Sequence, residues 1–153
     1  MKIAIIVPME EEAEFYKKHF KSENKEVFGT TEFDHFSVNG NDIYLGLSGI
    51  GKVNAAMNLT SLLTKEDIDL IFMTGSAGSL QEDVKRKDLI LPNKFMYYDA
   101  HNTSAGNYVE GQIPQEPAGY TLDNAFRAKF AVYLKEHDIP FKEGLIVTGD
   151  SFI

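Results

Sequence analysis

The sequence predicts a three-layer α/β fold with a mixed central sheet and flanking helices. Short apolar runs alternate along the chain with helical patterns, as strands alternate with helices around parallel sheets. A turn sequence at residues 39–41, NGN, lies between two strand-like segments and indicates an antiparallel hairpin, which makes the sheet mixed. The 153 residues contain no interdomain linker, so we expect one domain over residues 1–153.

The first half of the chain begins with the apolar run KIAIIV at residues 2–7, typical of a strand covered on both faces. A helix should follow over residues 8–20, because three glutamates open this segment and basic residues close it. Residues 33–38 and 42–48 should form the hairpin. Residues 49–66 should form a glycine-rich turn and a helix.

We expect the inner side of this second helix to carry four apolar residues, namely Val53, Met57, Leu62 and Leu63. The second half should contain three more strands, at residues 69–73, 88–92 and 144–148. Residues 93–121 are rich in Asn, Gly, Pro and Tyr and predict a long surface excursion. An amphipathic helix over residues 122–137 should place Phe126, Phe130 and Leu134 on one face.

The composition argues against several classes of partner. The net charge is −8, from 23 acidic and 15 basic residues, which does not suit nucleic acid or an acidic membrane surface. The absence of cysteine excludes disulfides and thiolate metal sites. The N-terminal apolar run is too short for a signal peptide or a membrane helix, so we expect a cytoplasmic protein.

Four segments that end predicted strands or precede helices carry candidate site residues, namely VPMEEE, LSGIG, MTGSAG and VTGDSF. In α/β sheets, ligands bind beyond the carboxyl ends of the strands. Acidic residues in a first helical turn also interact well with the helix dipole, and that alone explains most of Glu10 to Glu12. A carboxylate at the sheet edge near Met9 is the alternative, as a general base.

The common nucleotide and nucleophile motifs are missing. GIGKV lacks the spacing of a P-loop, and Asn54 occupies the third-glycine position of the dinucleotide motif. The histidines lack zinc-pair spacing, which leaves a metal pair at Asp99 and His101 only as a minor alternative. The small residues around Ser76 expose backbone N–H groups to a ligand or form a tight turn.

Five segments together resemble the 5′-methylthioadenosine/S-adenosylhomocysteine nucleosidases of the nucleoside phosphorylase superfamily: MKIAIIVPMEEE, SGIGKVNAA, TGSAGSL, EGQIPQEPAGY and GLIVTGDSFI. The resemblance implies a homodimeric α/β enzyme that uses neither metal nor organic cofactor. It would hydrolyse the N-glycosidic bond of either nucleoside and release adenine and a thioribose.

The resemblance also assigns roles to residues. Glu12 resembles the base that activates water, while Ser76, Ala77 and Gly78 resemble the loop beside the ribose and that water. Phe152 would stack on adenine and the Ile153 backbone would bond to it. The residues that would line the pocket near the ribose and alkylthio group are Met9 and Ile50.

Two departures from the family pattern matter. Family chains continue past GDSFI with a Met-Glu segment for the ribose hydroxyls and an aspartate that protonates the purine. We therefore expect an N-terminal portion, in which loss of a general acid would reduce catalysis by about 10²–10⁴-fold. The family's His-Asp-Ala-Asp run is here Tyr98 to His101, and Ala105 or a neighbour replaces the following aromatic, for which Tyr108 is the compensating candidate.

Two other functions remain open. A phosphorolytic nucleoside phosphorylase would need a phosphate site, yet the first loop carries three glutamates that would repel the anion. A non-catalytic protein that binds adenine nucleosides is the second alternative.

Overall fold

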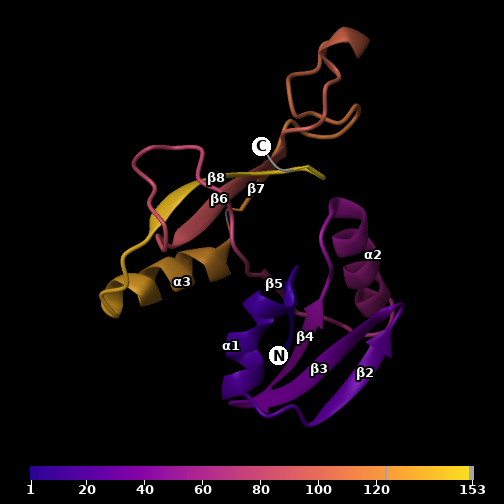
Figure 1. Cartoon of the computed structure of the whole chain (residues 1–153), viewed down its shortest axis with the longest axis vertical. Helices are drawn as coiled ribbons and strands as arrows, with labels where there is room; N and C mark the ends of the chain where they lie inside the picture. Colours follow the sequence, from indigo (N-terminus) through magenta and orange to yellow (C-terminus); the bar gives the residue numbers. More distant parts are fainter. Residues whose placement is uncertain (123, 152–153) are drawn as a thin grey trace. The chain divides into compact units, whose positions relative to one another are not determined.

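The computed structural model describes residues 1–122 and 124–151. It divides into two compact units, Met1–Ala77 and Gly78–Ile153, which we describe separately (Figure 1). Within the described residues, every helix is too short or too polar to cross a bilayer. The expected single domain stays a prediction.

Unit 1 contains five strands and two helices. In chain order these are β1 (Lys2–Val7), α1 (Glu10–His19), β2 (Asn24–Phe28), β3 (Thr31–Val38), β4 (Asn41–Leu47), α2 (Lys52–Leu63) and β5 (Leu70–Met73). The sheet order is β2-β3-β4-β1-β5, with β1 parallel to β4 and β5 and with β3 antiparallel to its neighbours. The expected mixed sheet is therefore present in unit 1.

The helices of unit 1 cover opposite faces of this sheet (Figure 1). Alternate residues of β1 point to opposite faces. Ala4 and Ile6 pack in a cluster with Leu62 of α2, whereas Val7 packs in a second cluster with Ala13 of α1. These two clusters give unit 1 the predicted α/β/α layering.

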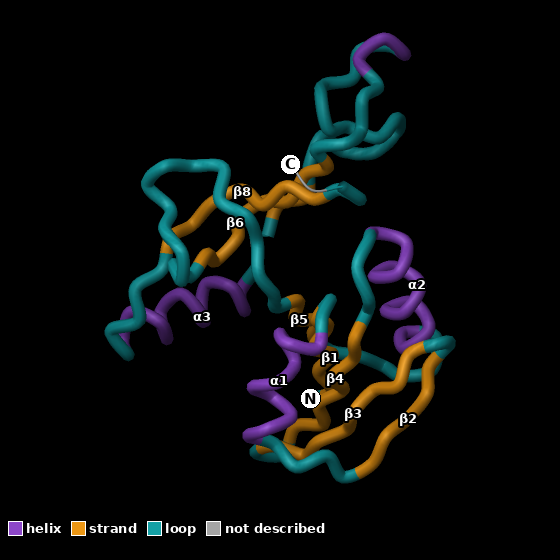
Figure 2. Tube along the Cα trace, in the orientation of Figure 1, coloured by secondary structure: helices purple, strands orange, loops and turns teal. Residues whose placement is uncertain are grey.

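Unit 2 has a smaller sheet in the order β7-β6-β8. Its elements are β6 (Ile90–Tyr97), a 3₁₀ turn η1 (Thr103–Ala105), β7 (Tyr120–Thr121), α3 (Ala125–Glu136) and β8 (Lys142–Thr148). β6 is parallel to β8 and antiparallel to β7. The connection from β6 to β7 is mostly loop (Figure 2).

Arg127 anchors α3 to this sheet. Its Nε donates to the Pro92 carbonyl of β6 at 2.7 Å, and its Nη2 lies 3.2 Å from Glu143 Oε1 of β8. One guanidinium therefore joins the helix to both parallel strands.

Three sequence expectations need correction. In α2, Val53 and Met57 are 73% and 45% exposed and Leu63 is also exposed, whereas Leu62 is fully buried. On α3, Leu134 is buried as expected but Phe126 is exposed. The predicted excursion over residues 93–121 is shorter, because β6 continues to Tyr97 and β7 begins at Tyr120.

Candidate active site

Glu12 is the best-anchored of the candidate site residues. It is the third residue of α1, whose N-cap is Met9. Its Oε2 accepts a hydrogen bond from the Met9 backbone N–H at 3.2 Å, while the Glu12 N–H donates to the Met9 carbonyl. Helix geometry therefore turns this carboxylate back toward the end of β1.

The loop after β5 supplies two further donors to Glu12. The Ser76 backbone N–H lies 2.6 Å from Glu12 Oε1, and the Ser76 hydroxyl lies 2.8 Å from the same oxygen. β5 pairs with β1 in parallel, so the two strands end at the same edge of the sheet. The two predicted segments, VPMEEE and MTGSAG, therefore meet through a half-buried carboxylate held by three donors.

Gly75 permits this close approach. A Cβ at position 75 would lie 3.0 Å from Glu12 Oε1 and 3.3 Å from its Cδ. Such contacts are tighter than side chains normally accept, so glycine lets the loop pass directly beside the carboxylate.

Tyr16 is a site-supporting residue that sequence reasoning missed. Its hydroxyl donates to Thr74 Oγ1 at 3.4 Å. Tyr16 is four residues after Glu12, so both side chains lie on one face of α1. The four-residue spacing was the signal in the sequence that could have identified Tyr16. The two side chains contact the loop after β5 at two positions, Thr74 and Ser76.

The loop after β4 carries Ile50, another predicted site residue. Ile50 is 60% exposed. The neighbouring Ser48 is buried, and its N–H donates to the Val7 carbonyl at the end of β1 at 2.9 Å. Ile50 thus lies in the loop that follows β4, at the same edge of the sheet as Met9, which follows the neighbouring parallel strand β1.

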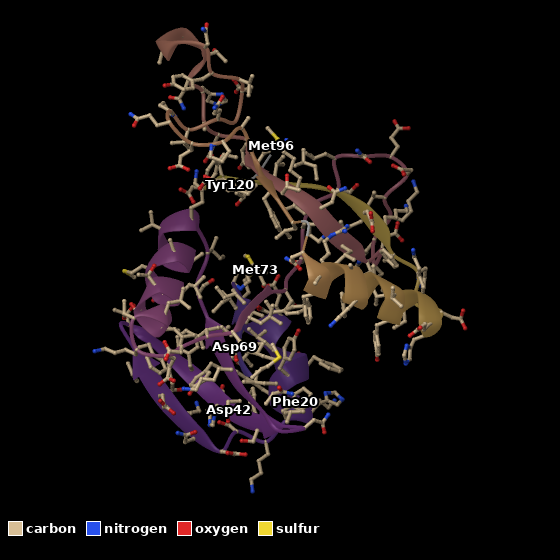
Figure 3. The ribbon with its side chains drawn as sticks, turned by 180° about the vertical axis from the view of Figure 1, so that it is seen from behind. Phe20, Asp42, Asp69, Met73, Met96 and Tyr120 are labelled. Carbon is tan, nitrogen blue, oxygen red and sulfur yellow. The ribbon has the colours of Figure 1, made fainter. Side chains whose placement is uncertain are left out.

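Met73 lies at the end of β5, immediately before the Ser76 loop (Figure 3), and its side chain is exposed. Ala77 is exposed directly after Ser76 and ends unit 1. Gly78 is exposed and is the first residue of unit 2. Of the three predicted loop residues, the structure brings Ser76 to the carboxylate.

In unit 2, the end of β6 holds the segment that follows β8. Asp99 Oδ2 accepts from the Asp150 backbone N–H at 3.0 Å, and the Tyr98 and Ser151 hydroxyls lie 3.2 Å apart. The predicted adenine contacts, Phe152 and Ile153, lie outside the described residues.

The pairing of Asp99 and His101 as metal ligands finds no support in their contacts. Asp99 bonds to the residue 150 backbone, whereas His101 Nδ1 pairs with Glu110. Each side chain therefore has a partner of its own within unit 2, and these contacts hold loop segments together.

Comparison with known proteins finds relatives over nearly the whole chain. A family model described as the phosphorylase superfamily matches residues 2–153. The 5′-methylthioadenosine/S-adenosylhomocysteine nucleosidase of Staphylococcus epidermidis is 38% identical over 151 residues, which are 99% of this chain and 66% of that protein. The chain therefore spans just under two thirds of that relative's length.

Solved structures extend the likeness to the fold. A Helicobacter pylori MTAN mutant with 5′-methylthioadenosine in its active site matches with a TM-score of 0.92 and 27% identity, over 99% of this chain and 66% of that one. The Neisseria meningitidis nucleosidase in complex with methylthio-immucillin-A matches with a TM-score of 0.91 and 31% identity, over the same shares. The predicted mixed α/β fold and the resemblance are confirmed, and the chain belongs to the phosphorylase superfamily.

Proposed function

We propose that this chain belongs to an enzyme that hydrolyses the N-glycosidic bond of 5′-methylthioadenosine and S-adenosylhomocysteine. The observation that carries the proposal is the Glu12 carboxylate, fixed by Ser76 and Met9 at the carboxyl edge of the sheet. The similarity to nucleosidases over nearly the whole chain supports the choice of substrate.

In this proposal Glu12 accepts a proton from the attacking water. Displacement at the anomeric carbon of the ribose requires a nucleophile on one side of that carbon and a protonated purine as the leaving group on the other. Ser76, Ala77 and Gly78 would lie beside the ribose and the water, and Met9 and Ile50 near the ribose and alkylthio group. Phe152 and Ile153 would contact adenine, as the family resemblance implies.

The first test is adenine release from methylthioadenosine in phosphate-free buffer. We expect release by the enzyme and a loss of at least about 10²-fold in the Glu12→Gln variant, because the amide cannot accept the proton. Glu11→Gln is the matched control, since Glu11 is the exposed neighbour of Glu12 in the same helical turn. Normal turnover by a folded Glu12→Gln protein would remove Glu12 from the mechanism.

Phosphate separates hydrolysis from phosphorolysis. A hydrolase forms the free thioribose at an unchanged rate when phosphate is added, whereas a phosphorylase forms the sugar 1-phosphate only with phosphate present. If a nucleoside binds in calorimetry to the folded chain and no adenine appears, the chain is a binding protein instead.

A cytoplasmic homodimer completes the proposal. The exposed apolar side chains of Val53 and Met57 on α2, together with the dimer that the resemblance implies, support self-association. Val53→Glu combined with Met57→Lys should shift the sedimentation coefficient from dimer to monomer. An unchanged dimer would show that this side of α2 is not the interface.

A further inference from the structure

A buried asparagine on α2 connects two loops of unit 1. Asn58 is 5% exposed, although the apolar pattern of α2 does not mark its position as internal. Its Nδ2 donates to the Ser48 carbonyl at 2.8 Å, and its Oδ1 accepts from the Thr30 hydroxyl at 3.2 Å. A carbonyl oxygen can only accept, so the Ser48 contact fixes which end of the amide faces it.

The Ser48 contact holds the start of the loop that carries Ile50. Ser48 is itself buried, and its N–H donates to the end of β1. The next residues turn sharply, because Gly49 and Gly51 have φ angles of +75° and +100°. The loop therefore leaves the sheet at Ser48, whose N–H is bonded to β1 and whose carbonyl is bonded to Asn58.

A second asparagine one helical turn earlier provides a natural comparison. Asn54 Nδ2 donates to the Ile50 carbonyl at 2.7 Å, but Asn54 is exposed. Water can replace an exposed hydrogen bond at little cost, whereas a buried carbonyl that loses its donor stays unpaired. Both asparagines contact the same loop, but losing the buried Asn58 bond should disturb that loop more than losing the exposed Asn54 bond.

We infer that Asn58 is a positioning residue that fixes the loop of residues 48–51, and through it the part of the nucleoside site lined by Ile50. The inference rests on the proposed function for its kinetic readout. Ile50 would contact the ribose and alkylthio portion, which the reaction leaves unchanged. Loss of such binding affects ground state and transition state alike, so it raises KM and leaves kcat in place.

The experiment compares Asn58→Leu with Asn54→Ala in the protein that releases adenine. We expect Asn58→Leu to raise KM for methylthioadenosine about tenfold, with kcat within about twofold, because a buried carbonyl loses its donor. Asn54→Ala should keep KM within about twofold. If Asn58→Leu does not fold, Asn58→Asp replaces it, since the carboxylate retains the shape but cannot donate to Ser48.

Amide hydrogen exchange gives a readout independent of turnover. Exchange over residues 48–51 should accelerate in the Asn58 variant while residues 59–63 of α2 keep their protection. Faster exchange along the whole helix, or an unchanged KM in a folded Asn58 variant, would overturn the inference. If the parent protein releases no adenine, the proposed function fails, and the exchange pattern alone decides the role of Asn58.

Discussion

At the scale of single residues, the site depends on how closely the β5 loop approaches a carboxylate. Glu12 receives two donors from Ser76 and one from Met9, so its orientation is fixed by backbone and side chain together. A general base in a hydrolytic reaction needs such a fixed position, because a displacement of about 1 Å can cost about 10²-fold in rate.

Gly75→Ala tests directly whether the position of the Glu12 carboxylate matters for turnover. The new methyl group would lie 3.0 Å from Glu12 Oε1, so the carboxylate or the loop must shift. We expect turnover to fall about 10–100-fold while the fold is retained, as measured by adenine release and circular dichroism. Gly144→Ala on β8 is the control, since its Cβ meets nothing within 4 Å. Equal activity in both variants would show that the site tolerates the displacement.

At the scale of elements, α2 is placed by polar contacts as well as by apolar ones. The turn between β2 and β3 reaches the helix at two positions. Thr30 donates to Asn58, and Gly29 lies so close to Ser61 that a Cβ there would be 2.4 Å from its Oγ. The hairpin turn and the helix are therefore fitted to each other through a residue without a side chain.

Gly29→Ala should destabilise the protein more than Gly40→Ala. Both glycines have positive φ, +63° and +75°, so either alanine brings backbone strain of about 1–2 kcal/mol. Only the first also meets a neighbour, because nothing lies within 4 Å of a Cβ at Gly40. Overpacking adds about 1–3 kcal/mol to the loss of unfolding free energy, measurable by urea titration. Matching losses would mean that Ser61 moves away without cost.

The sequence allowed prediction of most helices and strands, but not of which residues of each helix are buried. The apolar runs and the NGN turn led to β1, β3, β4, β5 and β8, because those signals are local. Periodicity assigned Val53 to the core and overlooked Asn58, since a buried amide is stabilised by distant partners that no local pattern contains. β2 was missed because its sequence, NKEVF, is largely polar, as suits a strand at the edge of the sheet.

The site was predictable to a similar extent. The carboxyl-edge argument placed Glu12 and Ser76 together, and the structure shows them bonded. The donors that hold them were not foreseeable in detail, because hydrogen-bond partners depend on the exact register of β1 with β5.

At the scale of the whole molecule, an ion pair makes stability depend on pH. Lys142 of β8 donates to Asp88 Oδ2 at 2.8 Å, and the Lys85 N–H donates to the same oxygen. The Lys142 hydrogen bond, followed by that from Lys85, lowers the pKa of Asp88 below its ordinary value of 3.8. The pair therefore stabilises the folded state above that value, and this contribution is lost as the pH falls through the lowered pKa.

Asp88→Asn should reduce the urea midpoint at pH 7, and the gap from the parent should close as the pH falls below about 3.8. The exposure of the pair keeps the effect modest and sensitive to salt. Glu82→Gln is the control, an exposed acid in the same loop. A gap that persists unchanged at low pH would assign the loss to something other than the charge.

The bond between Ser76 and Glu12 also has a consequence for folding. It joins residues 64 apart in the chain, and both depend on pairing between β1 and β5. Contacts so distant in sequence form slowly, after local helices and the β3–β4 hairpin. During refolding, helical signal should therefore return before activity does. The proposed catalytic carboxylate acquires its two Ser76 donors in one of the last steps, so activity would report that unit 1 has completed its fold.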